Sequence, residues 1–148
     1  MKINAAGIAI IKESEGLRLK AYRCPAGVWT IGYGSTGHDV YEGLEITADE
    51  AEARLSAAIE RLAAFISNLV PIGISDNMFS ALCSFVYNVG QAAFKKSTML
   101  KLILAGEPAA AADQFDRWVY AGGEKLPGLV TRRAREKKLF LTPDEVTA

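Results

Sequence analysis

Glu15 is the residue of this sequence best suited to acid–base chemistry. It ends a stretch with helical periodicity and begins the run EGLRLKAY (15–22), which is followed by the glycine-punctuated run PAGVWTIGYG (25–34). β-Forming residues between glycines are typical of short strands joined by tight turns. A carboxyl group at such a helix–strand junction can be partly withdrawn from water, which favours its neutral form. The pattern therefore indicates a general acid at Glu15.

Other interpretations of these acidic residues are open from the sequence. Glu13 carries a carboxyl group on the same helix, but on another face, where we expect it to be exposed. Without the motif around it, Glu15 would be interpreted as the helix-end partner of an ion pair with Arg18 or Arg117. The aromatic and glycine residues directly after Glu15 favour the general acid.

The composition limits the class of protein. The chain has 148 residues, 50% of them hydrophobic, which suits one domain with a sizeable core. Its 17 basic and 17 acidic residues cancel, so bulk charge does not indicate nucleic-acid binding. A basic run near the C-terminus is interpreted as a solvated helix face; it comprises Arg132, Arg133, Arg135, Lys137 and Lys138.

No pattern for a metal or a cofactor is present. Cys24 and Cys83 show neither a Cys-x-x-Cys spacing nor a Cys/His cluster, and we expect no metal and no cofactor. The apolar run 81–86 predicts that Cys83 is buried and unreactive. No apolar stretch approaches the roughly 20 residues of a membrane span, and 8–11 is too short for a signal peptide. We therefore expect no stable membrane insertion and folding in the cytoplasm.

Capping residues and hydrophobic periodicity predict the first elements. Asn4 caps a helix to about Ser14, and residues 20–41 form short strands. A capping box at 47–50 begins a long amphipathic helix that ends before Pro71.

The second half of the chain reads as helical. Ser75 caps an apolar core helix that stops at Gly90, and shorter helices follow at 98–105 and from Pro108 to the glycine pair 122–123. A last helix covers about 129–140.

These elements make a mostly helical α+β pattern. We expect a single domain over 1–148, with a small β lobe at about 16–46, a bridging helix at about 47–70 and a helical lobe at about 71–148. A cleft between such lobes would lie beside Glu15.

The motifs resemble those of phage-type lysozymes, the endolysins that cut peptidoglycan glycan strands. EGLRLKAY (15–22) with WTIGYG (29–34) is similar to the family's N-terminal signature, and ALCSFVYNVG (81–90) resembles its core helix and the Phe/Tyr-Asn-x-Gly end of that helix. FDRW (115–118) and GLVTRRARE (128–136) resemble its C-terminal helices. The resemblance covers nearly the whole chain, in order.

This resemblance implies a lysozyme-like two-lobed fold with the active site in the cleft. It implies hydrolysis of the β-1,4 bond between N-acetylmuramic acid and N-acetylglucosamine, for host cell lysis and phage release. By position, Glu15 would be the general acid, Cys24 would occupy the second catalytic position, and Thr30 would be the catalytic threonine.

The resemblance also implies residues that bind the substrate. Tyr87 and Asn88 fall where the family lines its cleft, and Trp118 with Arg117 falls where it supports the far lobe. Trp29 and Trp118 have rings able to stack on sugars, but we interpret both first as core residues.

Two positions depart from the family pattern. Ser35 stands where the family usually has His, a change expected to affect local structure, and Cys24 replaces the expected Asp. A thiol with the ordinary cysteine pKa of about 8.5 is only a few per cent thiolate near pH 7. Cys24 is therefore open to three roles, as the base that activates water, as a nucleophile, or as a bystander.

Two alternatives remain open beside the muramidase. With Cys24 a bystander, Glu15 alone would suit a lytic transglycosylase that forms an anhydro product. A catalytically dead module that binds peptidoglycan is the alternative from another class. For the muramidase, the resemblance implies a monomer that acts on peptidoglycan in the periplasm and cell wall and depends on a separate holin for access.

Overall fold

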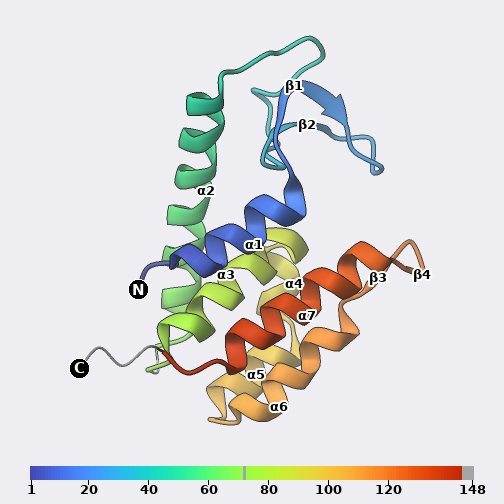
Figure 1. The fold of residues 1–148 in the computed structure, drawn as a ribbon. Coiled ribbons are helices and arrows are strands. Elements are labelled where there is room, and N and C mark those ends of the chain that lie inside the picture. Colours follow the sequence, from blue (N-terminus) through green and yellow to red (C-terminus); the bar gives the residue numbers. More distant parts are fainter. Residues whose placement is uncertain (72, 145–148) are drawn as a thin grey trace.

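The computed structural model describes residues 1–71 and 73–144, and it has a small β-ribbon lobe and a helical lobe (Figure 1). Helix α1 (Ala5–Glu15) begins at Asn4, whose side chain accepts a hydrogen bond from the Gly7 amide. Gly16 has a positive φ of 72° and ends the helix, so the chain turns directly into the ribbon.

The ribbon is a two-stranded antiparallel sheet. Strand β1 (Arg18–Arg23) pairs with β2 (Trp29–Gly32), with a register irregularity between Arg18 and Tyr22. The loop that follows is attached by the bridges Ile31–Ser35 and Lys20–Glu45. The predicted strands in 20–41 therefore form at their N-terminal end, and 33–46 is mostly a loop.

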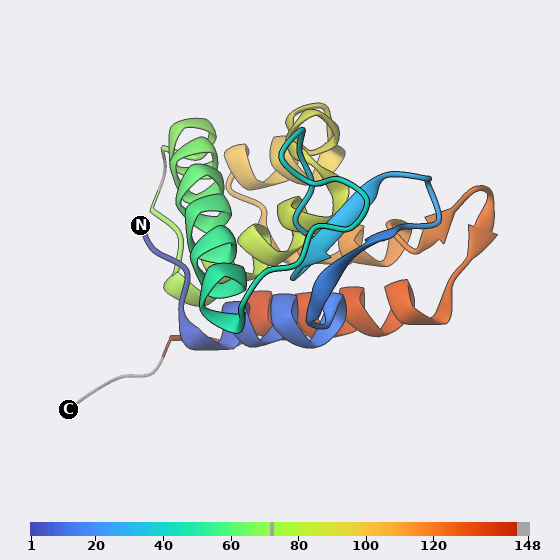
Figure 2. The same ribbon diagram turned by 90° about the horizontal axis from the view of Figure 1, so that it is seen from above.

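Helix α2 (Ala48–Leu69) connects the two lobes, as predicted (Figure 1). Thr47 and Glu50 form both hydrogen bonds of the capping box. Its buried face consists of Ala51, Leu55, Ile59, Leu62 and Ile66. Seen from above, α2 runs at a steep angle to α1 (Figure 2), and Ile11 of α1 packs with Leu55 and Ile59 of α2. No helix within the described ranges is long and apolar enough to cross a membrane.

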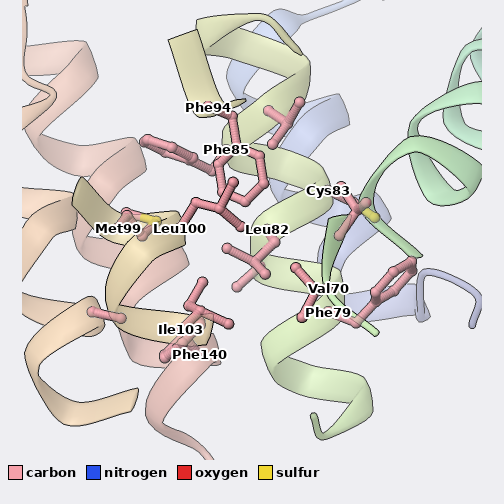
Figure 3. Close-up of a cluster of buried hydrophobic side chains, with 14 of the residues drawn as sticks. Val70, Phe79, Leu82, Cys83, Phe85, Phe94, Met99, Leu100, Ile103 and Phe140 are labelled. Carbon is pink, nitrogen blue, oxygen red and sulfur yellow. The ribbon is translucent and has the colours of Figure 1, made fainter. Parts of the chain in front are cut away.

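The helical lobe is built around α3 (Asp76–Val89), which is buried along most of its length and stops at Gly90, as predicted. Helix α3 packs against α7 (Pro127–Leu141), α1, α2 and α4 (Gln91–Lys95), and α5 (Thr98–Leu104) with α6 (Pro108–Asp113) completes the lobe. Phe85 of α3 packs edge to face with Phe94 and with Phe115, at ring-centroid distances of 6.3 and 5.3 Å. Phe85 and Phe94 are labelled in the core shown in Figure 3. Cys83 is fully buried in this core, as predicted.

The predicted helix that starts at Pro108 is shorter than expected. Helix α6 is followed by a 3₁₀ turn, η1 (Gln114–Arg117). A second, shorter hairpin of β3 (Tyr120–Ala121) and β4 (Glu124–Lys125) comes next. Gly122 and Gly123 have φ values of 58° and 82°, which suit the two-residue turn of a hairpin. The glycine pair therefore reverses the chain into β4. The short helix α4 was not predicted.

Both ends of the described chain contact the start of α3. The Asp144 carboxylate accepts hydrogen bonds from the amides of Asp76 and Asn77, each at 2.9 Å. The Asn4 side-chain amide donates to Asn77 Oδ1 at 2.8 Å. The N-terminus of the core helix is thus held by both ends.

Candidate active site

Glu15 lies where α1 meets the ribbon. It is the last residue of α1, and its side chain is 21% exposed. Gly34 follows β2 with a positive φ of 76°, and a β-carbon at this position would lie 2.9 Å from Glu15 Cδ. Glycine is required at 34 both for the backbone conformation and for the space that the carboxylate occupies.

The ion-pair partner of Glu15 is Arg132 of α7. Arg132 Nη1 lies 2.8 Å from Glu15 Oε1, so the partner is neither Arg18 nor Arg117, the two arginines that the sequence offered for the alternative interpretation. Arg18 instead lies over the Tyr22 ring, 4.4 Å from its centroid. α7 packs against both α1 and α3, which brings Arg132 to a carboxyl group 117 positions earlier.

Arg132 belongs to a buried cluster, which we call the charge cluster and define as Arg132, Arg133 and Glu136. Their side chains are 5%, 1% and 0% exposed, so the interpretation of the basic run as a solvated face is wrong for both arginines. Glu136 Oε2 accepts from Arg132 Nε at 3.2 Å, and Glu136 Oε1 lies 3.2 Å from Arg133 Nη1. The spacing of Glu136, three and four residues after the arginines, was the signal that the sequence offered for this cluster.

Helix α3 supplies the polar groups that complete the charge cluster. The Ser84 hydroxyl donates to Glu136 Oε2 at 2.5 Å, and the Ser84 carbonyl accepts from Arg132 Nη2 at 3.0 Å. Burial raises the pKa of Glu136, against the opposing effects of Arg133, Ser84 and Arg132. Burial lowers the pKa of Arg133 to about 10, which leaves the guanidinium charged at neutral pH. We take Glu136 as ionised, since it contacts two charged guanidinium groups.

A cleft of about 830 Å³ lies over this arrangement and includes Glu15, Asn88 and Arg132 in its wall. Pro25, directly after Cys24, forms part of the wall contributed by the ribbon lobe. A neighbouring hollow of about 360 Å³ shares Asn88, Leu126 and Leu129 with the cleft and adds Trp118. The structure therefore brings Glu15, Asn88 and Trp118 to one connected groove.

The profile of the phage lysozyme family matches residues 12–136. This chain belongs to the phage lysozyme family. It is 42% identical to the endolysin of Acyrthosiphon pisum secondary endosymbiont phage 1, over 95% of this chain and 98% of that protein. It is also 42% identical to the endolysin of Bacillus phage PZA, but it spans only 55% of that longer protein.

The fold is that of known muramidases. The solved muramidase domain of SpmX from Asticaccaulis excentricus superposes with a TM-score of 0.87 at 40% identity, covering 96% of this chain and 99% of that domain. The lysozyme-like, mostly helical α+β fold expected from the sequence is thus confirmed.

In this member of the phage lysozyme family, Cys24 lies at the turn between β1 and β2. Its side chain is partly buried, and its backbone amide donates a hydrogen bond to the Val28 carbonyl at 3.0 Å, which closes the turn. The Val28 amide, with help from Ala26 and Thr30, lowers the pKa of the Cys24 thiol despite some desolvation. Thr30 is only 4% exposed, and its hydroxyl donates a hydrogen bond to the Val28 carbonyl at 3.0 Å. The turn therefore makes the Cys24 thiol easier to ionise than an ordinary thiol.

Tyr87 and Trp118 have contacts within the protein. The Tyr87 hydroxyl donates to the Tyr33 carbonyl, which connects the helical lobe to the ribbon lobe. Trp118 packs edge-on against Phe85 with centroids 5.4 Å apart, and part of it faces the groove. Trp29 is half-buried below Arg23, whose guanidinium lies 5.1 Å from the indole centroid.

The remaining positions singled out in the sequence lie outside the acid–base arrangement. Ser35 accepts a hydrogen bond from Arg54 Nε at 3.0 Å, which attaches the loop after β2 to α2. Glu13 is exposed, as expected, and pairs with Arg135 at the rim of the cleft. Among the described residues, no three His, Cys, Asp or Glu side chains gather as metal ligands would.

Proposed function

We propose that this protein is a phage endolysin that hydrolyses the β-1,4 bond between N-acetylmuramic acid and N-acetylglucosamine in peptidoglycan. It is a glycoside hydrolase of the lysozyme type. The conclusion rests on one observation: residues 12–136 match the phage lysozyme family, in a fold similar to that of a muramidase domain, and the cleft of this fold has Glu15 in its wall.

Glu15 is proposed as the general acid. Cleavage of a glycosidic bond needs a proton on the leaving oxygen and stabilisation of an oxocarbenium-like transition state. The Glu15 carboxyl group lies in the cleft, is mostly removed from solvent, and is held between Gly34 and Arg132. These contacts fix its position while Oε2 remains without the ion-pair contact that Oε1 makes.

Cys24 and Thr30 are proposed as the pair that activates water. In this route the Glu15 proton passes to the leaving oxygen as the C1–O bond breaks. Water then attacks C1 and gives its proton to the Cys24 thiolate, while the Thr30 hydroxyl helps to hold the water. The lowered pKa of the Cys24 thiol, due first to the Val28 amide, supports this role over that of a bystander.

Asn88 and Trp118 are proposed as substrate-binding residues on the helical lobe. Both contribute to the groove, and an amide with an aromatic edge suits the polar and apolar faces of an N-acetylated sugar. Tyr87 is proposed to support the substrate site indirectly, by holding the ribbon lobe in place, because its hydroxyl already donates a hydrogen bond to the Tyr33 carbonyl.

The test is mass spectrometry of muropeptides released from purified peptidoglycan. Wild type should release hydrated reducing muramic ends, and Glu15→Gln should release none while it keeps its fold by circular dichroism. Glu13→Gln is the matched control, because it removes an exposed carboxylate at the rim of the same cleft and should keep most of the activity.

The other outcomes distinguish the alternatives. Anhydro ends from wild type would instead identify a lytic transglycosylase. Binding to peptidoglycan without any product would identify a wall-binding module. Equal activity of wild type and Glu15→Gln would remove Glu15 from the mechanism.

We propose further that residues 1–148 act as one domain and as a monomer. The groove is formed within one chain, which supports this view. Because its substrate is peptidoglycan, we propose that the protein acts in the periplasm and cell wall. Before lysis it would be in the host cytoplasm, and a separate holin would give it access to the wall. Light scattering tests the monomer, and lysis with and without a co-expressed holin tests the dependence.

A further inference from the structure

The charge cluster has contacts with two residues of the cleft. Through Arg132 it reaches the Glu15 carboxylate at 2.8 Å. Through Arg133, whose Nη2 donates to Asn88 Oδ1, it reaches the side-chain amide of Asn88. Glu136, at the centre, contacts both arginines and is fully buried.

Such a cluster is difficult to explain by stability alone. Desolvation of buried charges commonly offsets their attraction, so a buried ion pair is weak evidence for stabilisation. Among the described residues, Arg133 Nε and Nη1 and Glu136 Oε1 have no hydrogen-bond partner, so the contact between Arg133 and Glu136 is one of charge at 3.2 Å. Both cleft contacts, by contrast, are hydrogen bonds.

We propose that Glu136 is a positioning residue of the active site, which balances the charge of Arg132 next to Glu15 and holds Arg133 against Asn88. The proposal rests on the role of Glu15 as general acid. A guanidinium next to a carboxyl group in general favours the ionised form, which cannot donate a proton. The negative charge of Glu136 behind Arg132 offsets part of the positive charge at this point of the cleft.

The second part concerns the orientation of Asn88. Because Arg133 donates to Asn88 Oδ1, the amide NH₂ group of Asn88 is left for the cleft. The cleft then presents a donor, which suits an acceptor on the sugar such as the carbonyl oxygen of an N-acetyl group. Loss of the Arg133 side chain would allow the Asn88 side-chain amide to rotate, so that its oxygen could face the cleft.

Other charged and titratable groups near Glu15 define the background. Arg132 and Arg133 come from α7, Tyr87 from α3, and Tyr22 of β1 lies near Tyr87. The exposed pair Glu13–Arg135 lies at the rim of the cleft. Only Glu136 adds a buried negative charge behind Arg132 within the described residues.

The test is the pH profile of kcat/KM on purified peptidoglycan for four proteins. Glu136→Gln leaves Arg132 uncompensated, so the alkaline limb should move to lower pH by about one unit. Arg133→Gln removes a positive charge, so the limb should move to higher pH, and KM should rise several-fold because Asn88 loses its partner. The double variant restores the charge balance, so its limb should return to the wild-type position while KM stays raised.

Arg135→Gln is the matched control, because it removes a positive charge from the same helix at an exposed site, and its limb should stay in place. If Glu136→Gln does not fold, the Arg133→Gln variant alone tests the proposal. An alkaline limb of its kcat/KM profile that stays at the wild-type pH would overturn the proposal. Thermal destabilisation with unchanged limbs would make the cluster purely structural. A wild type without muropeptide products would instead refute the proposed function.

Discussion

The hydroxyl of Tyr87 donates a hydrogen bond to the backbone carbonyl of Tyr33, so the core helix α3 holds the loop that follows the ribbon. Tyr33 precedes Gly34, whose missing side chain makes room for Glu15. This contact between the lobes therefore lies one residue before Gly34, the residue that packs against the proposed general acid Glu15.

Replacement of Tyr87 by Phe should weaken the connection between the lobes. Loss of one such hydrogen bond costs about 1 kcal/mol in the free energy of unfolding. We expect kcat/KM to fall several-fold as well, because the ribbon would no longer fix Gly34 against Glu15. Denaturant titration and muropeptide release measure the two effects.

Tyr33→Phe is the matched control for that variant. It removes the hydroxyl that lies 3.3 Å from Glu52 but leaves the Tyr33 carbonyl in place. Equal losses in both variants would show that the ring environment, and not the contact with the carbonyl, matters.

Replacement of Cys24 by Asp should preserve or raise the activity and extend it to lower pH. A base acts in its deprotonated form, and an aspartate ionises near pH 4, well below the ordinary cysteine value of about 8.5. The acid limb of kcat/KM should therefore move to lower pH, although the Val28 amide already lowers the pKa of the Cys24 thiol. Stopped assays on peptidoglycan across pH 4–9 provide the comparison.

Cys24→Ala and alkylation of the wild type complete the series. Both should reduce the rate strongly, and Cys83, which is fully buried, should not react in the folded protein. Full activity of Cys24→Ala would make the thiol a bystander. A thioglycosyl adduct in the mass spectrum, or a product of retained anomeric configuration, would make it a nucleophile.

The loop after β2 should lose one of its attachments, the contact between Asp39 and Arg54, at low pH. Arg54 donates to Asp39 at 2.8 Å and lowers the pKa of that carboxyl group below 3.8. A lowered folded-state pKa gives stability that is present above the unfolded value and disappears as the pH falls through the folded value. Asp39→Asn should therefore destabilise the protein at pH 7 and make little difference at pH 2.

Thermal melts at the two pH values measure this difference. Glu42→Gln is a suitable control, since it removes an exposed carboxylate of the same loop that has no salt bridge within the described residues. A loss for Asp39→Asn that is the same at both pH values would exclude the ionic contact as its cause.

Local signals in the sequence predicted most of the fold. The capping residues Asn4, Thr47 and Ser75 each make the expected side-chain hydrogen bond. These signals act over a few residues and can be recognised directly. The hairpin at 120–125 was missed because its two-residue strands are too short to show alternation.

The candidate site could be predicted only where a motif marks it. Glu15 and Asn88 come from motifs and lie in the cleft, whereas the roles of Arg132, Arg133 and Glu136 depend on how α7 packs against α1 and α3. Charged residues at spacings of three and four are common on exposed helix faces. The sequence alone therefore did not distinguish a buried cluster from a solvated one.

The contacts of Asn4 and Asp144 with Asn77 bring the two ends of the described chain together at the start of α3. Proteins with adjacent ends commonly tolerate circular permutation. A linker could join the ends here, and a new opening at the exposed Gly122–Gly123 turn would leave Glu15, Cys24 and α7 in continuous segments. We therefore expect such a permutant to keep the geometry of the site although the order of the segments along the chain has changed.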